Sequence, residues 1–268
     1  MKTYFPINLK LTHFIFLLVS FFALISIPFC QSEGASAYNK NHRKKILYLA
    51  MGDSITSGLF ASTKDKAYPK VLSKYFAQKL GYPVASKTVG GPFNMADTGV
   101  KQLPKVLADK PQIVSLQYGS NEANPILHGN PKELRNSLET IIKKLQNSPS
   151  HPYIFLFKVW RNDTTGKYDR VITSVGHKHD LPVISLKKIY ADRQVSSGPV
   201  GRHTFAGPAD NWHPNNIAMK TIAQAAYKKT SGKVNHLFGY HKPRLYSRLM
   251  PKLFRELWKF HTFAEGSS

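Results

Sequence analysis

Apolar runs of strand length alternate with helical patterns along most of the chain, and this alternation limits the folds that the chain can adopt. Five runs have strand character, at 45–51, 83–89, 111–119, 152–160 and the beginning of 181–190. Five stretches have helical character, at 68–81, 95–110, 131–146, 166–180 and 215–229. Strands that alternate with helices form a parallel sheet with helices on both faces. The sequence therefore predicts an α/β fold with a parallel sheet of about five strands.

The helical patterns differ in clarity. The stretch 131–146 starts with Pro131, a residue suited to the first turn of a helix, and its apolar residues gather on one face. The stretch 95–110 contains Pro104, so we expect a kinked or split helix there. Between 191 and Asp210 the chain reads as a polar loop.

Polar and small residues follow the predicted strands at the points where the strands end. They form four segments, namely Gly52-Asp53-Ser54, Gly90-Gly91, Gly119-Ser120-Asn121-Glu122 and, after the last strand, Asp210-Asn211-Trp212-His213-Pro214. Reacting groups of open parallel sheets lie beyond the carboxyl ends of the strands. The sequence therefore predicts that these four segments meet at one edge of the sheet.

Three of these residues have the chemistry of a serine nucleophile and its base. The Ser54 hydroxyl is a poor nucleophile unless a base accepts its proton, and His213 titrates near neutral pH. Asp210, three residues before His213, can accept the other imidazole proton and stabilise the imidazolium ion. We predict Ser54, His213 and Asp210 as catalytic residues.

The same edge offers hydrogen-bond donors for a developing oxyanion. When a serine attacks an acyl carbon, the carbonyl oxygen becomes negative, and donors already in place lower the barrier. The candidates are the backbone N–H of Ser54, a backbone N–H at Gly90 or Gly91, and the side-chain amide of Asn121. Glycine suits the second position because the backbone must approach the substrate closely.

The segments MGDSITSG, YGSNE and DNWHP, with a glycine after the second strand, resemble the motifs of the SGNH hydrolase superfamily, or GDSL esterases and lipases. The resemblance covers about residues 45–230 and implies a three-layer α/β/α fold with a flavodoxin-like sheet. It implies that Ser54 is the nucleophile and a backbone donor, that Asp210 and His213 are its partners, and that Asn121 and Gly91 complete the oxyanion hole. It implies no metal and no cofactor.

Two departures from the family pattern are visible. The third motif usually reads Gly-x-Asn-Asp, whereas this chain has Glu122 at the last position, so the support of that loop is expected to differ. The second motif is loose, because the stretch after the second strand contains Gly90, Gly91 and also Gly99.

The N-terminal part has the pattern of an export signal. Lys2 and Lys10 precede an uncharged, largely apolar stretch at 11–32, and Ala35-Ser36-Ala37 matches a signal-peptidase site. We predict a signal peptide at 1–37 and a basic linker at 38–44. An uncleaved membrane anchor is an alternative, and lipid attachment at Cys30, the single cysteine, is another. All three predict a secreted protein or one held at the outer cell surface.

The chain is strongly basic, with 38 Lys and Arg, 15 Asp and Glu and a formal net charge of +23. A field of this sign concentrates anionic partners, and salt weakens it. Outside a cell, such partners are an anionic cell-wall polymer or an anionic membrane surface. No specific nucleic acid is expected, because the sequence has no helix-turn-helix, zinc or aromatic RNA-binding signature.

The segment 232–268 lies beyond the predicted hydrolase domain at 45–231. Within 245–260, two rows of apolar residues spaced by four alternate with basic residues, which is typical of a basic amphipathic helix, interrupted by Pro251. Either this segment lies on an anionic membrane, or its apolar rows pack on the catalytic domain or a second subunit.

Two further groups of residues have ordinary interpretations. His177 and His179 alternate without other metal ligands nearby in the sequence, which is typical of a solvated helix end, so no metal site is predicted. Trp160 and Arg161, after the fourth strand, either line a substrate cleft or are a rim residue and a surface charge.

Together these features predict a secreted or surface-attached serine esterase that cleaves acyl esters through an acyl-enzyme on Ser54. We expect short acyl groups, such as O-acetyl groups on carbohydrate. The alternatives are an acyltransferase that passes an acyl group to a cell-wall sugar, a lipase or lysophospholipase, and a non-catalytic glycan-binding protein.

Overall fold

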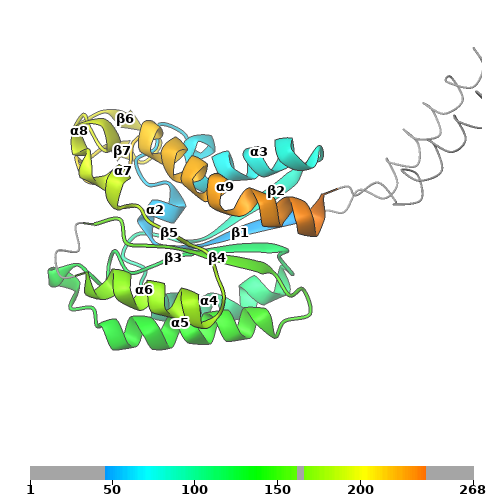
Figure 1. Cartoon of the computed structure of the whole chain (residues 1–268). Helices are drawn as coiled ribbons and strands as arrows, with labels where there is room; N and C mark the ends of the chain where they lie inside the picture. Colours follow the sequence, from blue (N-terminus) through cyan, green and yellow to red (C-terminus); the bar gives the residue numbers. More distant parts are fainter. Residues whose placement is uncertain (1–45, 162–165, 240–268) are drawn as a thin grey trace, which may run out of the picture. The chain divides into compact units, whose positions relative to one another are not determined.

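Five parallel strands form one sheet in the order β2-β1-β3-β4-β5 in the computed structural model (Figure 1). The strands are β1 (Ile46–Gly52), β2 (Val84–Gly90), β3 (Ile113–Gln117), β4 (Tyr153–Phe157) and β5 (Val183–Ile184). The structure describes residues 46–161 and 166–239. The predicted signal peptide and anchor, Cys30, the linker 38–44 and the amphipathic pattern at 245–260 lie outside the described residues.

Helices cover both faces of the sheet (Figure 1). One layer consists of α3 (Tyr68–Leu80) and α9 (Asn216–Phe238), and the other of α4 (Ala96–Ala108), α5 (Pro131–Gln146) and α6 (Lys167–Lys178). Central strands of such a sheet are covered on both faces, and accordingly every residue of β3 and every residue of β1 except Leu47 is buried. The predicted three-layer α/β/α fold is confirmed.

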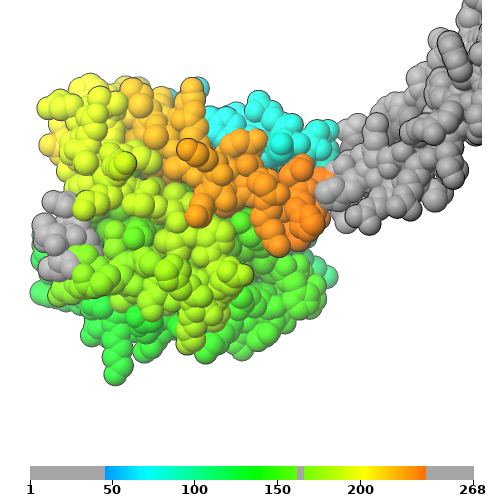
Figure 2. All heavy atoms as spheres, in the orientation of Figure 1, coloured from blue at the N-terminus to red at the C-terminus, as the bar shows by residue number. Residues whose placement is uncertain are grey.

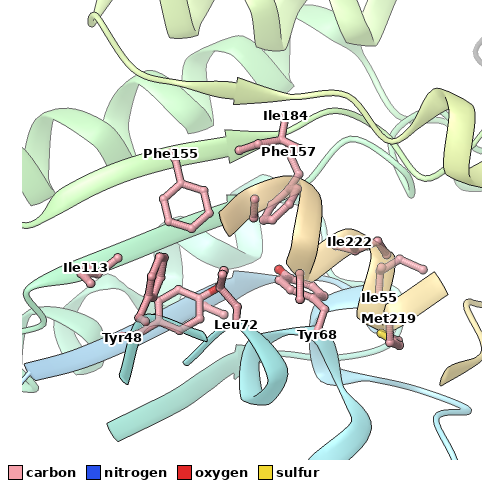
Figure 3. Packing of buried hydrophobic residues seen from close by; sticks show 14 of the residues in the cluster. Tyr48, Ile55, Tyr68, Leu72, Ile113, Phe155, Phe157, Ile184, Met219 and Ile222 are labelled. Atoms are coloured by element: carbon pink, nitrogen blue, oxygen red, sulfur yellow. The ribbon is translucent and has the colours of Figure 1, made fainter. Parts of the chain in front are cut away.

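Side chains of β1 alternate between two cores. Tyr48 and Ala50 belong to the core under α3 and α9, whereas Leu49 and Met51 belong to the core under α4, α5 and α6. The first core is rich in aromatic rings; Tyr68 and Phe157, for example, meet edge to face with centroids 5.1 Å apart (Figure 3). These two packed cores fix the sheet on which the site is built.

The register of the strands brings the predicted motifs to one edge. Gly52, the last residue of β1, pairs with Gly90 at the end of β2 and with Gln117 at the end of β3. The segments that follow these three strands therefore begin side by side, as the parallel arrangement predicts.

Short elements fill the connections at this edge. They are α2 (Ser54–Ser57), η1 (Lys64–Lys66), η2 (Pro125–Leu127), α7 (Lys187–Ala191), α8 (Arg193–Ser196) and a hairpin of β6 (His203–Thr204) and β7 (Gly207–Pro208). The stretch 181–190 thus gives a strand of two residues followed by a short helix. The expected polar loop before Asp210 contains one more helix and the hairpin.

Two helices differ from the sequence expectation. The helix α4 is a single element with Pro104 inside it, so it is not split at the proline, which removes one backbone hydrogen bond of the helix. The helix α9 continues to Phe238, past the predicted domain boundary at 231, because Val234 is buried in the first core. Within the described ranges, no helix combines the length and apolar character needed to cross a membrane.

Candidate active site

Ser54 lies in the first turn of α2, directly beyond the end of β1. Asp53 is the N-cap of this helix, and its carboxylate accepts a hydrogen bond of 2.8 Å from the Ile55 N–H. The turn requires glycine at 52, because a Cβ there would lie 2.2 Å from the Thr56 hydroxyl oxygen. Asp53 therefore serves as the cap, and the Ser54 hydroxyl is left for another partner.

His213 and Asp210 lie next to Ser54. The Nε2 atom of His213 is 3.0 Å from the Ser54 Oγ, and its Nδ1 is 2.6 Å from Oδ2 of Asp210. The other Asp210 oxygen accepts hydrogen bonds from the backbone N–H groups of Trp212 and His213. The structure thus brings the three residues that the sequence singled out into one hydrogen-bonded chain.

The loop that carries His213 is tied to its surroundings on both sides. Asn215 caps α9 by accepting from the Ile217 and Ala218 N–H groups, and its amide donates to the carbonyls of Val195 and Gly198. A residue that follows His213 by two positions is thereby bonded to two elements, which limits the movement of the imidazole.

Burial and hydrogen bonding set the protonation of the pair. Burial lowers the pKa of the His213 imidazole below its usual 6.5, and the hydrogen bond to Asp210 opposes this only in part. For Asp210, burial acts to raise the pKa, but the hydrogen bonds from the backbone and side chain of His213 and from the Trp212 N–H outweigh it and hold the pKa below its usual value. At neutral pH, His213 is therefore neutral and Asp210 ionised, as a general base and its supporting carboxylate need to be.

Two aromatic rings contact the imidazole edge to face. The ring of Phe60 lies 5.2 Å from that of His213, and the ring of Trp212 lies 4.7 Å from it. Phe60 has a φ of 63°, and its carbonyl accepts a hydrogen bond of 2.6 Å from Arg202. Phe60 and Arg202 are neighbours of the site that sequence reasoning missed, and no local pattern in the sequence indicates them.

Trp160 and Arg161 separate into two different roles. Trp160 is fully buried, and its indole N–H donates to the Trp212 carbonyl over 2.9 Å. It therefore holds the backbone of the loop that carries His213. The guanidinium of Arg161 lies over the Trp212 ring, 5.2 Å from its centroid, and donates to the Ser120 carbonyl. Arg161 therefore lies at the rim of the site, whereas its neighbour in the sequence, Trp160, belongs to the core.

Asn121 follows β3 and is nearly buried, at 8% exposure. Its Nδ2 donates a hydrogen bond of 2.8 Å to the carbonyl of Asn94, in the loop between β2 and α4. A side-chain amide has two N–H groups, so one holds the orientation of Asn121 and the other is available to a substrate. This geometry suits the predicted oxyanion role, which stays a prediction.

The three glycines at the end of β2 and beyond it have different surroundings. A Cβ at Gly90 would lie 1.9 Å from the Gly52 carbonyl oxygen, so glycine is required there for the pairing of the two strands. A Cβ at Gly99, inside α4, would lie 2.5 Å from the Tyr118 hydroxyl, so this glycine serves helix packing. Gly91 has open space at its Cβ position and stays the predicted backbone donor.

Glu122 replaces the usual aspartate and holds two elements together. One carboxylate oxygen accepts from the Ala96 N–H at the start of α4 over 2.7 Å, and the other accepts from the Gly119 N–H over 2.8 Å. Burial raises the pKa of Glu122, and these hydrogen bonds oppose the rise. The expected difference in loop support is therefore present, because Glu122 reaches α4 and caps its N-terminus. The N-cap residue of α4 itself, Met95, makes no side-chain hydrogen bond.

Beneath Ser54, Gln117 connects several buried polar groups. Its amide N–H₂ donates to Asp53 and to the Ser120 hydroxyl, and its oxygen accepts from the Thr56 hydroxyl. Burial raises the pKa of Asp53 to about 7, since the hydrogen bonds it accepts offset only part of the loss of hydration. The network joins the ends of β1 and β3 and supports the backbone on both sides of Ser54.

His177, in α6, and His179, directly after it, lie away from this edge. His177 is exposed, as expected of a solvated helix end, but the His179 side chain is only 11% exposed and contacts the Glu139 carboxylate at 3.1 Å, so the expectation is wrong for His179. Among residues 46–161 and 166–239, no three His, Cys, Asp or Glu side chains gather as metal ligands would.

Residues 50–220 match the GDSL-like Lipase/Acylhydrolase family. The matched region begins in β1 and ends in α9, so it includes every predicted site residue. No curated protein matches the chain by sequence.

Several solved structures have a similar fold. The family 3 carbohydrate esterase of Clostridium thermocellum is 18% identical, with a TM-score of 0.60 over 73% of this chain and 100% of that one. A lipase/acylhydrolase from Enterococcus faecalis is 24% identical, with a TM-score of 0.51 over 70% and 96%. A two-domain esterase active on acetylated mannans is 16% identical, with a TM-score of 0.58 over 79% of this chain and 55% of that one. At these identities the similarity establishes the fold.

Proposed function

The chain belongs to the GDSL-like lipase/acylhydrolase family and is therefore a carboxylic ester hydrolase, and we propose that it is an extracytoplasmic serine esterase that removes short acyl groups, such as O-acetyl groups, from carbohydrate. The family match confirms the resemblance stated from the sequence motifs. The acyl-enzyme mechanism, the acyl chain length, the carbohydrate and the location are the parts that we propose.

The hydrogen-bonded chain from Asp210 through His213 to Ser54 is the observation that carries the mechanism. His213 takes the Ser54 proton as the hydroxyl oxygen attacks the acyl carbon, and Asp210 stabilises the imidazolium. The negative oxygen accepts hydrogen bonds from the Ser54 and Gly91 N–H groups and from the free N–H of Asn121.

The intermediate then collapses and the acyl-enzyme forms. His213 gives its proton to the departing alcohol, which leaves the acyl group esterified to Ser54. A water molecule, deprotonated by His213, attacks this ester, and the acid leaves as Ser54 regains the proton. The side chains named here supply every proton transfer, so the cycle needs no further group.

The substrate class is supported by two observations. The similar structures include a carbohydrate esterase and an esterase active on acetylated mannans. The net charge of +23 favours an anionic polymer as the carrier of the ester, and an anionic cell-wall glycan combines both properties. The predicted export signal at 1–37 would bring the enzyme to such a polymer.

The test is labelling with a fluorophosphonate, which reacts with an activated serine. The wild type should be labelled and Ser54→Ala should not, whereas Ser57→Ala, a matched change in the same short helix, should retain labelling. A series of p-nitrophenyl esters then compares kcat/KM with acyl chain length, and acetate release is measured from an acetylated glycan.

Labelling of Ser54→Ala at the wild-type rate would remove Ser54 from its proposed role. A kcat/KM that rises steadily with chain length, without acetate release from the glycan, would contradict the short-acyl substrate.

A further inference from the structure

The layer formed by α3 and α9 carries basic residues without acidic ones. Neither helix contains Asp or Glu. Their lysines are exposed or partly exposed and are Lys70, Lys74, Lys79, Lys220, Lys228, Lys229 and Lys233. Among the ion pairs of the described residues, none involves these lysines. The positive charge of this layer is therefore not balanced within it.

The opposite layer differs in this respect. Its helices contain Asp97, Glu133, Glu139 and Asp169 as well as basic residues. Lys101 pairs with Asp97, and Glu139 pairs with both Lys143 and Lys178. The helices of the opposite layer still carry a net charge of +5, against +7 for α3 and α9, so the two layers differ in whether acidic partners are present and not in the sign of their charge.

Most of the lysines of α3 and α9 lie in the halves of these helices that are farther from the active site. Both α3 and α9 follow loops at the catalytic edge and run to the amino-terminal edge of the sheet (Figure 1). Their ends meet there, because the Tyr82 hydroxyl, just after α3, donates to the Phe238 carbonyl over 2.5 Å. The helix α9 has 23 residues, so its two ends are about 35 Å apart.

The exposed side of α9 forms rows along the helix. Lys229, Lys233 and Leu237 are spaced by four, as are Lys220 and Lys228 with Gln224 between them. Leu237, in the last turn of the helix, is 42% exposed. Figure 2 shows α9 at the surface of the molecule, in orange. The lysine rows give α9 a positively charged exposed side, and anionic lipid headgroups attract such a side.

The chain enters and leaves the domain at this same edge. Ile46, the first residue of β1, pairs with Val84, two residues after Tyr82, which contacts the end of α9. The sequence before residue 46 contains the apolar stretch 11–32, and the sequence after 239 contains the basic amphipathic pattern at 245–260. The described domain thus begins and ends at the edge of the sheet where α3 and α9 end.

We propose that the C-terminal halves of α3 and α9 (Lys74, Lys79, Lys228, Lys229, Lys233 and Leu237, the basic face) dock on an anionic phospholipid membrane. The lysines contact the anionic headgroups. Because the catalytic edge lies at the N-terminal ends of both helices, docking through their C-terminal halves leaves that edge tilted away from the bilayer. Docking itself does not depend on the proposed function. The consequence for the substrate does rest on it, because an esterase site that faces away from the bilayer acts on a polymer beyond the membrane and not on a membrane lipid.

The test measures the distance of two positions from the bilayer in the full chain. Cys30→Ser removes the native thiol. Gly232→Cys or Ile126→Cys then introduces a single cysteine, to which a fluorescent donor is attached. Gly232 has open space at its Cβ position on α9, and Ile126 is 81% exposed at the catalytic edge. The chain is mixed, during detergent removal, with vesicles that contain a headgroup-linked acceptor and either phosphatidylglycerol or only phosphatidylcholine.

With phosphatidylglycerol, energy transfer from position 232 should be at least threefold that from position 126. The triple variant Lys79→Glu, Lys229→Glu, Lys233→Glu should reduce this ratio to that in phosphatidylcholine, as should high salt. The matched control Lys105→Glu, Lys132→Glu, Lys144→Glu changes the same charge on the opposite layer and should retain the ratio. Hydrolysis of p-nitrophenyl acetate should be unchanged in both triple variants.

Equal transfer from the two positions, or no association with anionic vesicles, would overturn the proposal. The proposal would also be overturned if soluble dextran sulfate shielded the donor at position 232 while anionic lipid gave no energy transfer. The partner of these lysines would then be a soluble polyanion. Ser54→Ala should dock as the wild type does. Loss of the proposed esterase activity alone would therefore leave the docking result intact.

Discussion

Asp210 acts on the site through both of its carboxylate oxygens. One fixes the backbone of Trp212 and His213, and the other accepts the Nδ1 proton of His213. The second bond decides which tautomer of the imidazole faces Ser54, because only the tautomer protonated on Nδ1 presents a free nitrogen to the hydroxyl.

Asp210→Asn tests this role. The asparagine amide would donate toward Nδ1 and favour the tautomer with its proton on Nε2, so we expect kcat to fall by about 10³–10⁴-fold while the fold is retained. The measurement is hydrolysis of p-nitrophenyl acetate, with circular dichroism for the fold. Asp180→Asn, on the exposed surface of the opposite layer, should have wild-type kcat; a similar loss there would mean that the effect is not specific to the pair.

The pH dependence of kcat/KM follows from the environment of His213. Because burial lowers its pKa, the imidazole becomes protonated, and unable to accept the Ser54 proton, only below its usual 6.5. We expect activity to be constant near neutral pH and to fall on the acid side with a midpoint below 6.5. A midpoint above 6.5 would show that the carboxylate of Asp210 dominates over burial.

At the scale of elements, Glu122 joins α4 to the end of β3. Its carboxylate satisfies two buried backbone N–H groups, of Ala96 and Gly119, that belong to different elements. The loop of Asn121 therefore depends on a bond to a helix that is more than twenty residues away in sequence.

Glu122→Ala should leave both N–H groups without a partner and lower the free energy of unfolding by about 2–4 kcal/mol. Urea denaturation measures this loss, and Glu133→Ala, an exposed acidic residue in the first turn of α5, is the control. An equal effect of the two changes would mean that Glu122 does not cap α4 in solution.

The end of α9 is a second feature at this scale. Val234 is fully buried beyond the predicted domain boundary, so the last two turns belong to the folded domain. Val234→Ala should lower the free energy of unfolding by about 2 kcal/mol, whereas the exposed Lys233→Ala should change it by less than about 0.5 kcal/mol. If removal of the valine methyl groups has no effect, these turns do not pack on the core.

For the molecule as a whole, the buried carboxyl of Asp53 links stability to pH. Its pKa is about 7 in the folded chain against 3.8 in the unfolded chain, so the folded state binds the proton more tightly between these values. The stabilisation is complete below about pH 4 and is lost as pH rises to 7. Glu122, whose pKa is also raised by burial, acts in the same direction.

Asp53→Asn removes this contribution. The free energy of unfolding of the wild type, relative to the variant, should fall by up to about 4 kcal/mol between pH 4 and pH 7. Urea denaturation of both proteins across this range measures the difference. Parallel curves would show that the Asp53 carboxyl does not keep its proton in the folded state.

The sequence by itself determined the elements, the parallel sheet and the set of residues at its catalytic edge. Apolar periodicity distinguishes strands from helices, and parallel strands have the same polarity, so groups that follow each strand must meet. Ser54, Asp210 and His213 could be selected in this way because their residue types and positions after strands are local facts of the sequence.

Only the tertiary structure decided which atoms pair. The cap that Glu122 provides, the bond from Asn121 to Asn94, and the rings of Phe60 and Trp212 against His213 all join distant segments. The extent of α9 was decided in the same way, since Val234 is helical because it packs on the core. Such contacts depend on distances between elements, which local periodicity does not contain, and for that reason the sequence could not supply them.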